Sequence, residues 1–353
     1  MLSSALALFI SFSGALTSAA AEPVNPPFRL IQTRNSRTLQ RDLRSAAQAG
    51  YRVLGATPGS TLDGKPLILV LMQLDPPAGG PVEYAVLAPS GDLDDETARS
   101  RMNALGNEGY RLAPGRLVTR RVEDFWLPQA AYEAQLTLIL ERSVSPRRFA
   151  YDVIRFDDFE TFQHNLATRR AEGYEVLALV NSARRLRAVL ARPLEPGAPD
   201  GEPREYRLLM QATNRGLRRA LKRAGSRGYR AIAAADASIH TPAMVLVEKG
   251  PAAPATYAYR VLDDPVQKQR RGKLETKLNR HGSEGYRVVP GGSTESALLL
   301  ELAPGTPAGT HYRAIASRDP PGLPRALEQA TGEGYRFVTM LADSDGTIVL
   351  LEK

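Results

Sequence analysis

The chain has 353 residues, of which 43% are hydrophobic and 24% charged, as is ordinary for a folded protein. It contains no cysteine, which excludes disulfides, a thiol nucleophile and a cysteine-ligated metal. The net charge is +8, and 39 of the 46 basic residues are Arg because only seven are Lys. A basic balance favours polyanionic partners, although these positive charges are spread along the chain among 38 acids.

The first 21 residues form a separate segment. They are mostly apolar and carry no charged side chain before Glu22. The small residues Ala19-Ala20-Ala21 are typical of a signal peptidase site, so we expect cleavage after Ala21. No second apolar stretch of about 18 residues follows, so we expect no membrane span after cleavage. The predicted location is therefore periplasmic or secreted.

The rest of the chain repeats one pattern. The dipeptide Gly-Tyr occurs six times, where about one occurrence is expected by chance from 29 Gly and 13 Tyr. The pairs begin at Gly50, Gly109, Gly173, Gly228, Gly285 and Gly334. We therefore expect six copies of one structural unit.

Each copy predicts an amphipathic helix before Gly-Tyr. Apolar residues stand seven and eleven positions before the Gly, for example Leu43 and Leu39, and this spacing places them on one helix face. Asp158 and Asn214 are among the expected N-caps. The Gly is expected to leave the helix through a left-handed backbone conformation.

Three strands complete each copy. One opens with an aromatic residue before the helix, one begins at the Tyr of Gly-Tyr, and one is apolar at nearly every position. Such an apolar strand belongs in the middle of a sheet. The predicted fold is α+β, with six tandem β-α-β-β repeats. Each repeat has a mostly antiparallel three-stranded sheet and one helix, and neighbouring repeats pack together.

Stretches rich in Pro and Gly set most of the repeat boundaries. After the signal peptide at 1–21 we expect repeats at 28–74, 82–142, 148–192, 204–249, 256–302 and 310–353. The second repeat carries an insertion at 116–133.

The aromatic-led strand, the helix that ends in Gly-Tyr and closing strands such as Val245-Leu-Val-Glu-Lys249 resemble the small bacterial DUF4177 domain. Six copies would cover nearly the whole mature chain. The resemblance implies a fold and no activity, and the third copy departs from the pattern because Glu175 follows its Tyr.

The residue after Gly-Tyr is the main binding candidate. In five copies it is arginine, namely Arg52, Arg111, Arg230, Arg287 and Arg336. Repeated guanidinium groups could bind carboxylates or phosphates of a polymer. The alternative is an ion pair with an acid, such as the Glu before the Gly (Glu108) or the Glu of the closing strand (Glu301). Trp126, in the insertion, is a second candidate for a partner contact.

No pattern of catalysis or metal binding is present. The four histidines lie in different copies without metal-ligand spacing, and no serine lies in a nucleophile motif. We therefore expect no catalytic residue, no metal and no cofactor.

The preferred interpretation is a non-catalytic binding or scaffolding array in the bacterial envelope, because linked weak sites give avidity. The expected partner is a protein or an anionic envelope polymer. Nucleic acid is not expected, because the signal peptide argues against it. The alternative is a hydrolase of an envelope polymer, with a site formed between repeats.

Overall fold

The structure is a computed structural model that describes residues 26–60, 66–74, 80–89, 96–123, 132–144, 146–182, 185–195, 204–211, 213–238, 241–251, 256–263, 271–293, 297–317, 322–343 and 346–353. The predicted signal segment and Trp126 lie outside these residues. Within the described residues the chain forms six units in sequence order, each with one helix and three strands.

The helices precede the Gly-Tyr pairs. They are α1 (Ser36–Gln48), α2 (Glu96–Asn107), α3 (Phe159–Ala171), α4 (Asn214–Gly225), α5 (Arg271–Ser283) and α6 (Leu323–Gly332). The first strands of the units are β1 (Phe28–Thr33), β4 (Glu83–Leu87), β7 (Phe149–Arg155), β10 (Glu205–Leu209), β13 (Ala258–Asp263) and β16 (Tyr312–Ser317).

The second strands follow Gly-Tyr and the third strands close each unit. The second strands are β2 (Tyr51–Ser60), β5 (Arg111–Glu123), β8 (Glu175–Ser182), β11 (Arg230–Ser238), β14 (Arg287–Ser293) and β17 (Arg336–Asp343). The third strands are β3 (Pro66–Leu74), β6 (Tyr132–Arg142), β9 (Arg185–Pro193), β12 (Thr241–Lys249), β15 (Ala297–Leu302) and β18 (Gly346–Glu352). The insertion expected at 116–133 begins inside β5, which continues to Glu123.

In every unit the third strand lies between the first and the second, and every strand pair is antiparallel. The predicted fold class is thus confirmed. The central strand is buried on both faces, as Val70, Leu71 and Met72 of β3 show with no exposed surface. This burial explains why its sequence is a continuous apolar run.

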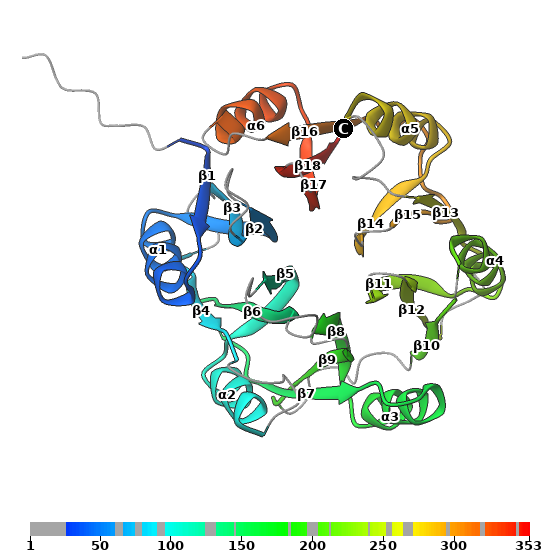
Figure 1. The fold of residues 1–353 in the computed structure, drawn as a ribbon, viewed down its shortest axis with the longest axis horizontal. Coiled ribbons are helices and arrows are strands. Elements are labelled where there is room, and N and C mark those ends of the chain that lie inside the picture. The colour runs from blue at the N-terminus through cyan, green and yellow to red at the C-terminus, as the bar shows by residue number, and fades with distance from the viewer. Residues whose placement is uncertain are drawn as a thin grey trace, which may run out of the picture.

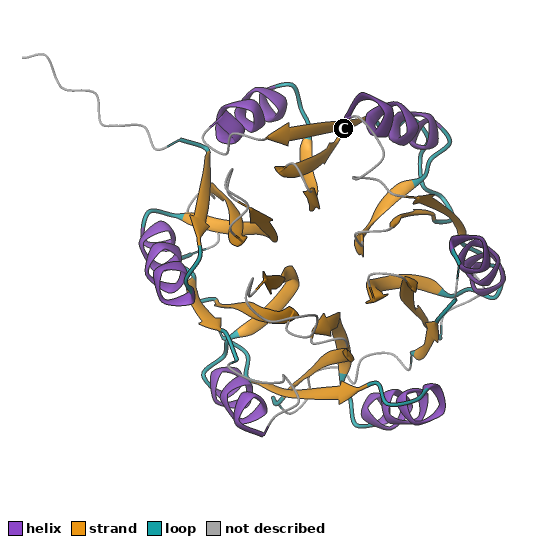
Figure 2. Ribbon diagram, in the orientation of Figure 1, coloured by secondary structure: helices purple, strands orange, loops and turns teal. Residues whose placement is uncertain are grey.

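The six units form a closed ring (Figure 1). The second strand of each unit lies innermost, and the helices lie on the outer rim (Figure 2). The first and last units are neighbours, since α6 contacts β1 and β17 contacts β2. The two ends of the chain therefore meet at one of the six interfaces, which we call the seam.

The helix ends follow the expected local chemistry. The six glycines of the Gly-Tyr pairs have φ between 84° and 91°, the left-handed conformation that leaves a helix at little cost for Gly. Asp158 caps α3 by accepting the N–H of Thr161 at 2.8 Å. The cap of α4 is Thr213, whose hydroxyl accepts the N–H of Gly216 at 3.0 Å, so the expectation of Asn214 was one residue late.

Each hydrophobic core is shared by two neighbouring units. Leu39 and Leu43 of α1 pack with Tyr84 of β4 and Ile139 of β6, which belong to the second unit. Fully burying one such aliphatic side chain contributes about 1.5–3 kcal/mol. Equivalent cores join units 2 and 3, 3 and 4, 4 and 5, and 5 and 6. The sixth core closes the ring, and in it Phe28 and Leu69 of the first unit pack with Leu323 and Leu327 of α6.

A β-bulge near the start of each second strand lets that strand serve two cores. In β2 the pairing register shifts between Val53 and Gly55. Val53 packs in the core shared with the second unit, whereas Leu54, at the bulge, packs in the core shared with the sixth. The bulge also interrupts the ladder of backbone hydrogen bonds, so nearby backbone groups need other partners.

Candidate functional site

The five arginines predicted as a binding row are distributed around the ring, each at the boundary between its own unit and the next. Arg230 Nε lies 3.3 Å from Glu301 Oε1, and Arg287 Nη1 lies 3.6 Å from Glu352 Oε1. In both pairs the glutamate belongs to the closing strand of the following unit. The alternative of an ion pair with a closing-strand Glu therefore describes these two arginines.

The other three arginines have different surroundings. Arg52 Nη2 donates to the backbone oxygen of Gly80 at 3.0 Å. The guanidinium of Arg111 lies 5.7 Å from the centre of the Phe149 ring, at a cation–π distance. Arg336 is exposed beside the seam. The five are not gathered in one cleft, and an anion-binding role for them stays a prediction.

Glu175 stands where the other five units have arginine. It lies at the boundary between units 3 and 4, where the closing-strand glutamate has another arginine as its partner. Here the closing-strand Glu248 belongs to unit 4 and binds Arg204 of its own unit through both carboxylate oxygens, at 3.1 and 3.0 Å. Glu175 interacts electrostatically with the same arginine. An arginine in place of Glu175 would add positive charge beside Arg204, so the substitution fits its neighbours.

The Gly-Tyr tyrosines act as core anchors. Tyr51, Tyr229 and Tyr286 are buried, and the ring of Tyr229 is covered by Arg207 of the same unit at 4.9 Å. Arginines cover the rings of Tyr110, Tyr174, Tyr286 and Tyr335 in the same way. In these five rings one face is therefore already covered by a cation and does not form an open stacking platform.

A second set of tyrosines links the units, and the sequence analysis did not identify this role. The Tyr151 hydroxyl, at the start of unit 3, accepts the N–H of Leu112 at 2.8 Å and donates to the carbonyl of Tyr110 at 2.9 Å. These backbone groups lie just before the bulge in unit 2. Four further first-strand tyrosines bond to the preceding unit at the same place, namely Tyr84, Tyr206, Tyr259 and Tyr312. Burial raises the pKa of Tyr151 to about 12, so its hydroxyl keeps its proton.

In the first five units the helix residue ten positions before the Gly takes part in a second link, to the first strand of the next unit. Gln163 donates to the carbonyl of Tyr206 at 3.0 Å and accepts the N–H of Leu208 at 2.6 Å. Gln40 binds Tyr84 and Val86 in the same way. A side-chain amide has both a donor and an acceptor, so it substitutes for a strand partner at an otherwise free edge.

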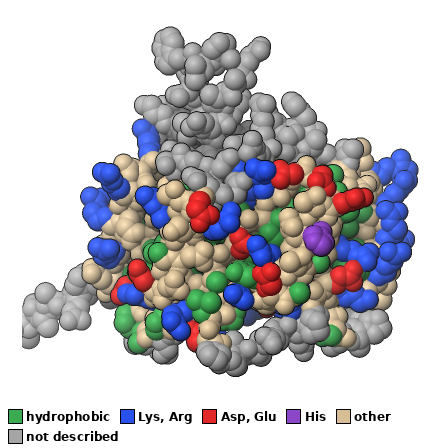
Figure 3. Space-filling view, turned by 90° about the horizontal axis from the view of Figure 1, so that it is seen from below, with side chains coloured by type: hydrophobic (Ala, Val, Ile, Leu, Met, Phe, Trp, Pro, Cys, Tyr) green, Lys and Arg blue, Asp and Glu red, His purple; other side chains and the backbone are tan. Residues whose placement is uncertain are grey.

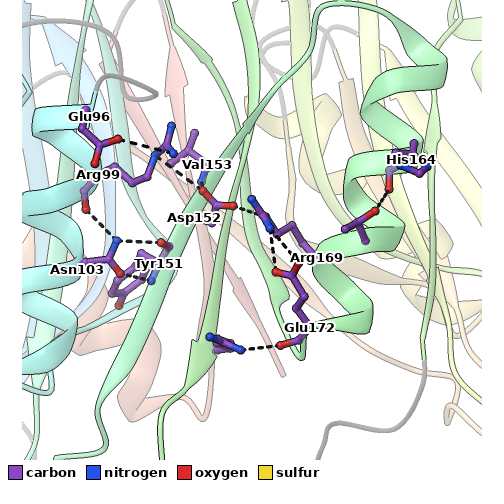
Figure 4. Close-up of polar contacts among 11 residues, drawn as sticks. Glu96, Arg99, Asn103, Tyr151, Asp152, Val153, His164, Arg169 and Glu172 are labelled. Carbon is purple, nitrogen blue, oxygen red and sulfur yellow. Dashed lines mark hydrogen bonds and ion pairs between the residues drawn. The ribbon is translucent and has the colours of Figure 1, made fainter.

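Figure 4 shows how this link is rebuilt between units 2 and 3, where Arg99 replaces the Gln. Arg99 cannot accept a hydrogen bond, and the carboxylate of Asp152 accepts the N–H of Val153 instead, at 2.8 Å. Asp152 lies between Arg99 and Arg169 and pairs with both. This buried carboxylate lines a polar cleft of about 460 Å³. Its ion pairs and its bond to the strand edge give it a structural role.

A second cleft, of about 590 Å³, lies between α3 and β10. Arg204, Arg207 and Lys249 line it. Arg204 is paired with Glu248, and Arg207 with Glu205 at 2.7 Å. Arg170 also lines this cleft, so two of its four cations have these ion pairs with acids.

The outer face of α4 is different, because its cations are exposed and the helix contains no acid. Its basic residues recur at helical spacing on the face opposite Leu217, Leu221 and Ala224. They are Arg215, Arg218, Arg219, Lys222 and Arg223, and Arg227 follows the helix. We call these six residues the α4 basic face. Figure 3 shows a column of Lys and Arg side chains along the right edge of the ring, the side on which α4 lies in Figure 1.

Within the described part of the chain, one member of this face has an ion pair. Arg218 binds Asp263 of β13 and donates to the carbonyl of Val261 at 3.2 Å. The cations at 215, 219 and 223 follow one another at intervals of four residues. Like charges at this spacing destabilise a helix by about 0.2–0.5 kcal/mol per pair. The protein therefore retains this charge at a cost to helix stability.

The described histidines form no catalytic or metal cluster. His164 and His311 are exposed, whereas His281 is buried on α5 with its Nδ1 3.7 Å from Glu284. No group of three or more His, Cys, Asp or Glu that could hold a metal occurs among the described residues. The described residues also contain no helix that is long and apolar enough to cross a bilayer.

Comparison with protein-family models gives no match, and comparison with curated proteins gives none either. The resemblance to the DUF4177 domain stays a prediction from the sequence.

Proposed function

We propose that the protein is an exported, non-catalytic scaffold that binds an anionic polymer of the bacterial envelope through the α4 basic face. The observation that carries the proposal is the run of exposed, uncompensated cations on α4. The expected export rests on the apolar segment before Glu22.

The chemistry of this face suits carboxylates and phosphates. Five of its six members are Arg, whose planar guanidinium binds either group with two parallel hydrogen bonds. Cations spaced along one helix face can contact several groups of a linear polymer together, so individually weak contacts add up. The ring gives the helix a rigid support, because Leu217 and Leu221 are buried in the core shared with unit 5.

The alternative, a hydrolase with a site between units, finds little support in the described residues. The acids that line the clefts at the 2/3 and 3/4 boundaries, Asp152, Asp157 and Glu205, are already paired with arginines. Where the structure describes the chain, the one His–carboxylate pair within 4 Å is His281 and Glu284, and it lies within a single helical turn at the end of α5.

Binding of polyglutamate and of polyphosphate at low ionic strength tests the proposal. The triple variant Arg219→Gln/Lys222→Gln/Arg223→Gln removes three charges from the α4 basic face. The matched control, Arg37→Gln/Arg41→Gln/Arg44→Gln, removes three charges from exposed positions of α1. We expect the α4 variant to bind at least about tenfold more weakly and the control to stay within about twofold. Equal weakening in both variants would mean that net charge alone governs binding and would reject the assigned site.

A further inference from the structure

The seam is the one interface of the ring across which the chain does not continue. The other five join units that are consecutive in the chain, whereas the seam joins unit 6 to unit 1. A covalent connection keeps two neighbouring units at high effective concentration. At the seam, closure depends on the non-covalent contacts and on the rest of the ring.

The tyrosine link cannot form at the seam. The residue that corresponds to Tyr84, Tyr151 and Tyr312 is Phe28, which is buried but has no hydroxyl. The backbone groups that such a hydroxyl would bind are the N–H of Phe337 and the carbonyl of Tyr335. Both residues are partly exposed, whereas their counterparts Val288 and Tyr286 in unit 5 are buried.

The edge link of Gln40 and Gln163 has no counterpart at the same position of α6. The α6 residue ten positions before Gly334 is Pro324, which has no side-chain donor or acceptor. The closing-strand position that holds Glu301 in unit 5 and Glu352 in unit 6 is Gln73 in unit 1, where it pairs with Phe28 in the sheet. An ion pair like those of Arg230 and Arg287 is thus excluded for Arg336. The seam thus lacks the tyrosine hydroxyl, the polar side chain at the helix position and the ion pair that the 4/5 and 5/6 interfaces have.

What holds the seam is apolar contact. Phe28, Leu69 and Leu71 pack against α6 and β18, and the Phe337 ring lies over Gly55, where an added Cβ would be 2.8 Å from its Cζ. If the seam opens, each of its two surfaces exposes an apolar patch, and exposure of such a patch to water is unfavourable. A second open chain offers the matching surface, because unit 6 of either copy fits unit 1 of the other.

We propose that the ring opens at the seam and that the exposed surfaces bind a second copy of this chain. Unit 6 of each chain then packs on unit 1 of the other, which gives a two-chain ring with two-fold symmetry. The exchange uses the apolar surfaces of the seam again, and because a ring of twelve units closes with a smaller rotation between neighbours, the angle at the interfaces must also change.

The test measures mass and local opening on the intact protein. Concentrated protein is incubated at a temperature just below its unfolding transition, cooled, and analysed by size-exclusion chromatography with light scattering. We expect a species of twice the monomer mass. Phe28→Tyr, which supplies the missing hydroxyl, should lower its fraction at least about threefold. Tyr312→Phe, which removes the hydroxyl from the 5/6 interface, should change it by less than about twofold.

Hydrogen exchange on the monomer separates the two parts of the proposal. Peptides from β1 and β17 should exchange faster than peptides from β16 and β14, and Phe28→Tyr should slow them. Equal protection of the two sets would overturn opening at the seam. Faster exchange at the seam without a two-chain species, under conditions where the protein stays folded, would overturn the role of a second copy.

Discussion

The hydroxyl of Tyr151 in the third unit is hydrogen-bonded to the backbone N–H of Leu112 in the second, at 2.8 Å. Both residues are buried. The tyrosine thus satisfies a buried backbone group that lies just before the bulge in β5. At the five internal interfaces this kind of contact makes one unit depend on the next for its backbone hydrogen bonds.

Tyr151→Phe should therefore lower the free energy of unfolding by about 1–3 kcal/mol, because the N–H of Leu112 and the carbonyl of Tyr110 lose their partner in a buried place. Urea denaturation measures the effect. Tyr174→Phe is the control, since Tyr174 is also buried and directly precedes β8, but its ring is held by packing and by Arg192. A control change as large as that of Tyr151→Phe would contradict the assigned role.

Gln163→Ala should cost about 1–2 kcal/mol, because two hydrogen bonds to the edge of β10 are lost. Gln163→Glu keeps the acceptor for the N–H of Leu208 and loses the donor to Tyr206. We expect it to retain part of the stability. Hydrogen exchange at Leu208 should accelerate in Gln163→Ala and less in Gln163→Glu; the same rate in both would argue against the link.

Gly225→Ala should destabilise the protein by about 3 kcal/mol. An added Cβ would lie 2.1 Å from the backbone oxygen of Tyr257, so the backbones of units 4 and 5 would have to separate. Gly272→Ala, in α5, is the control because nothing lies within 4 Å of its added Cβ. We expect this second change to stabilise by about 0.5 kcal/mol through helix propensity. Thermal unfolding of the two variants should shift in opposite directions.

His281 should make stability depend on pH. Burial lowers its pKa from the ordinary value, and Arg280 lowers it further, while Glu284 opposes them. The folded protein therefore favours the neutral imidazole, and the unfolded chain binds the proton more tightly. This contribution is present above about pH 6.5 and is lost as the pH falls below that value.

His281→Ala tests this dependence, because units 1, 4 and 6 have alanine at the same helix position (Ala46, Ala224 and Ala330). Unfolding free energies between pH 5 and 7.5 should fall less steeply with acid in the variant than in the wild type. Parallel curves would show that His281 does not titrate differently in the folded state.

The fold of one unit could be predicted from the sequence, because its signals are local. The Gly-Tyr pairs marked the helix ends, and the apolar run marked the central strand, which the observed strand order confirms. The closed ring could not be predicted, because the same faces would also pack in an open array. Closure of the ring depends on the angle between neighbouring units, and no local sequence pattern predicts this angle.

The residues that make the inter-unit contacts recur in the sequence, but their role could be recognised only in the structure. Gln40, Gln163 and Glu275 follow the helix residue that packs eleven positions before the Gly, and in isolation they look like solvated polar residues. Phe28 stands where the other first strands have tyrosine, and Pro324 stands where other helices have a polar residue. The structure shows that both exceptions lie at the same interface, the seam. The sequence from Gly216 to Arg223 indicates a basic helical stretch with a solvated face, and its basic residues are exposed in the structure.

The most direct measurement of the central functional claim is the salt dependence of polyphosphate binding. Affinities of the wild type and of Arg219→Gln/Lys222→Gln/Arg223→Gln are compared over a range of salt concentrations. Release of counterions by bound cations makes the logarithm of affinity fall with the logarithm of salt concentration. We predict a steep slope for the wild type and a slope shallower by about 2–3 for the variant. A wild type that binds no polyphosphate, or a variant that keeps both the affinity and the slope of the wild type, would contradict binding through α4.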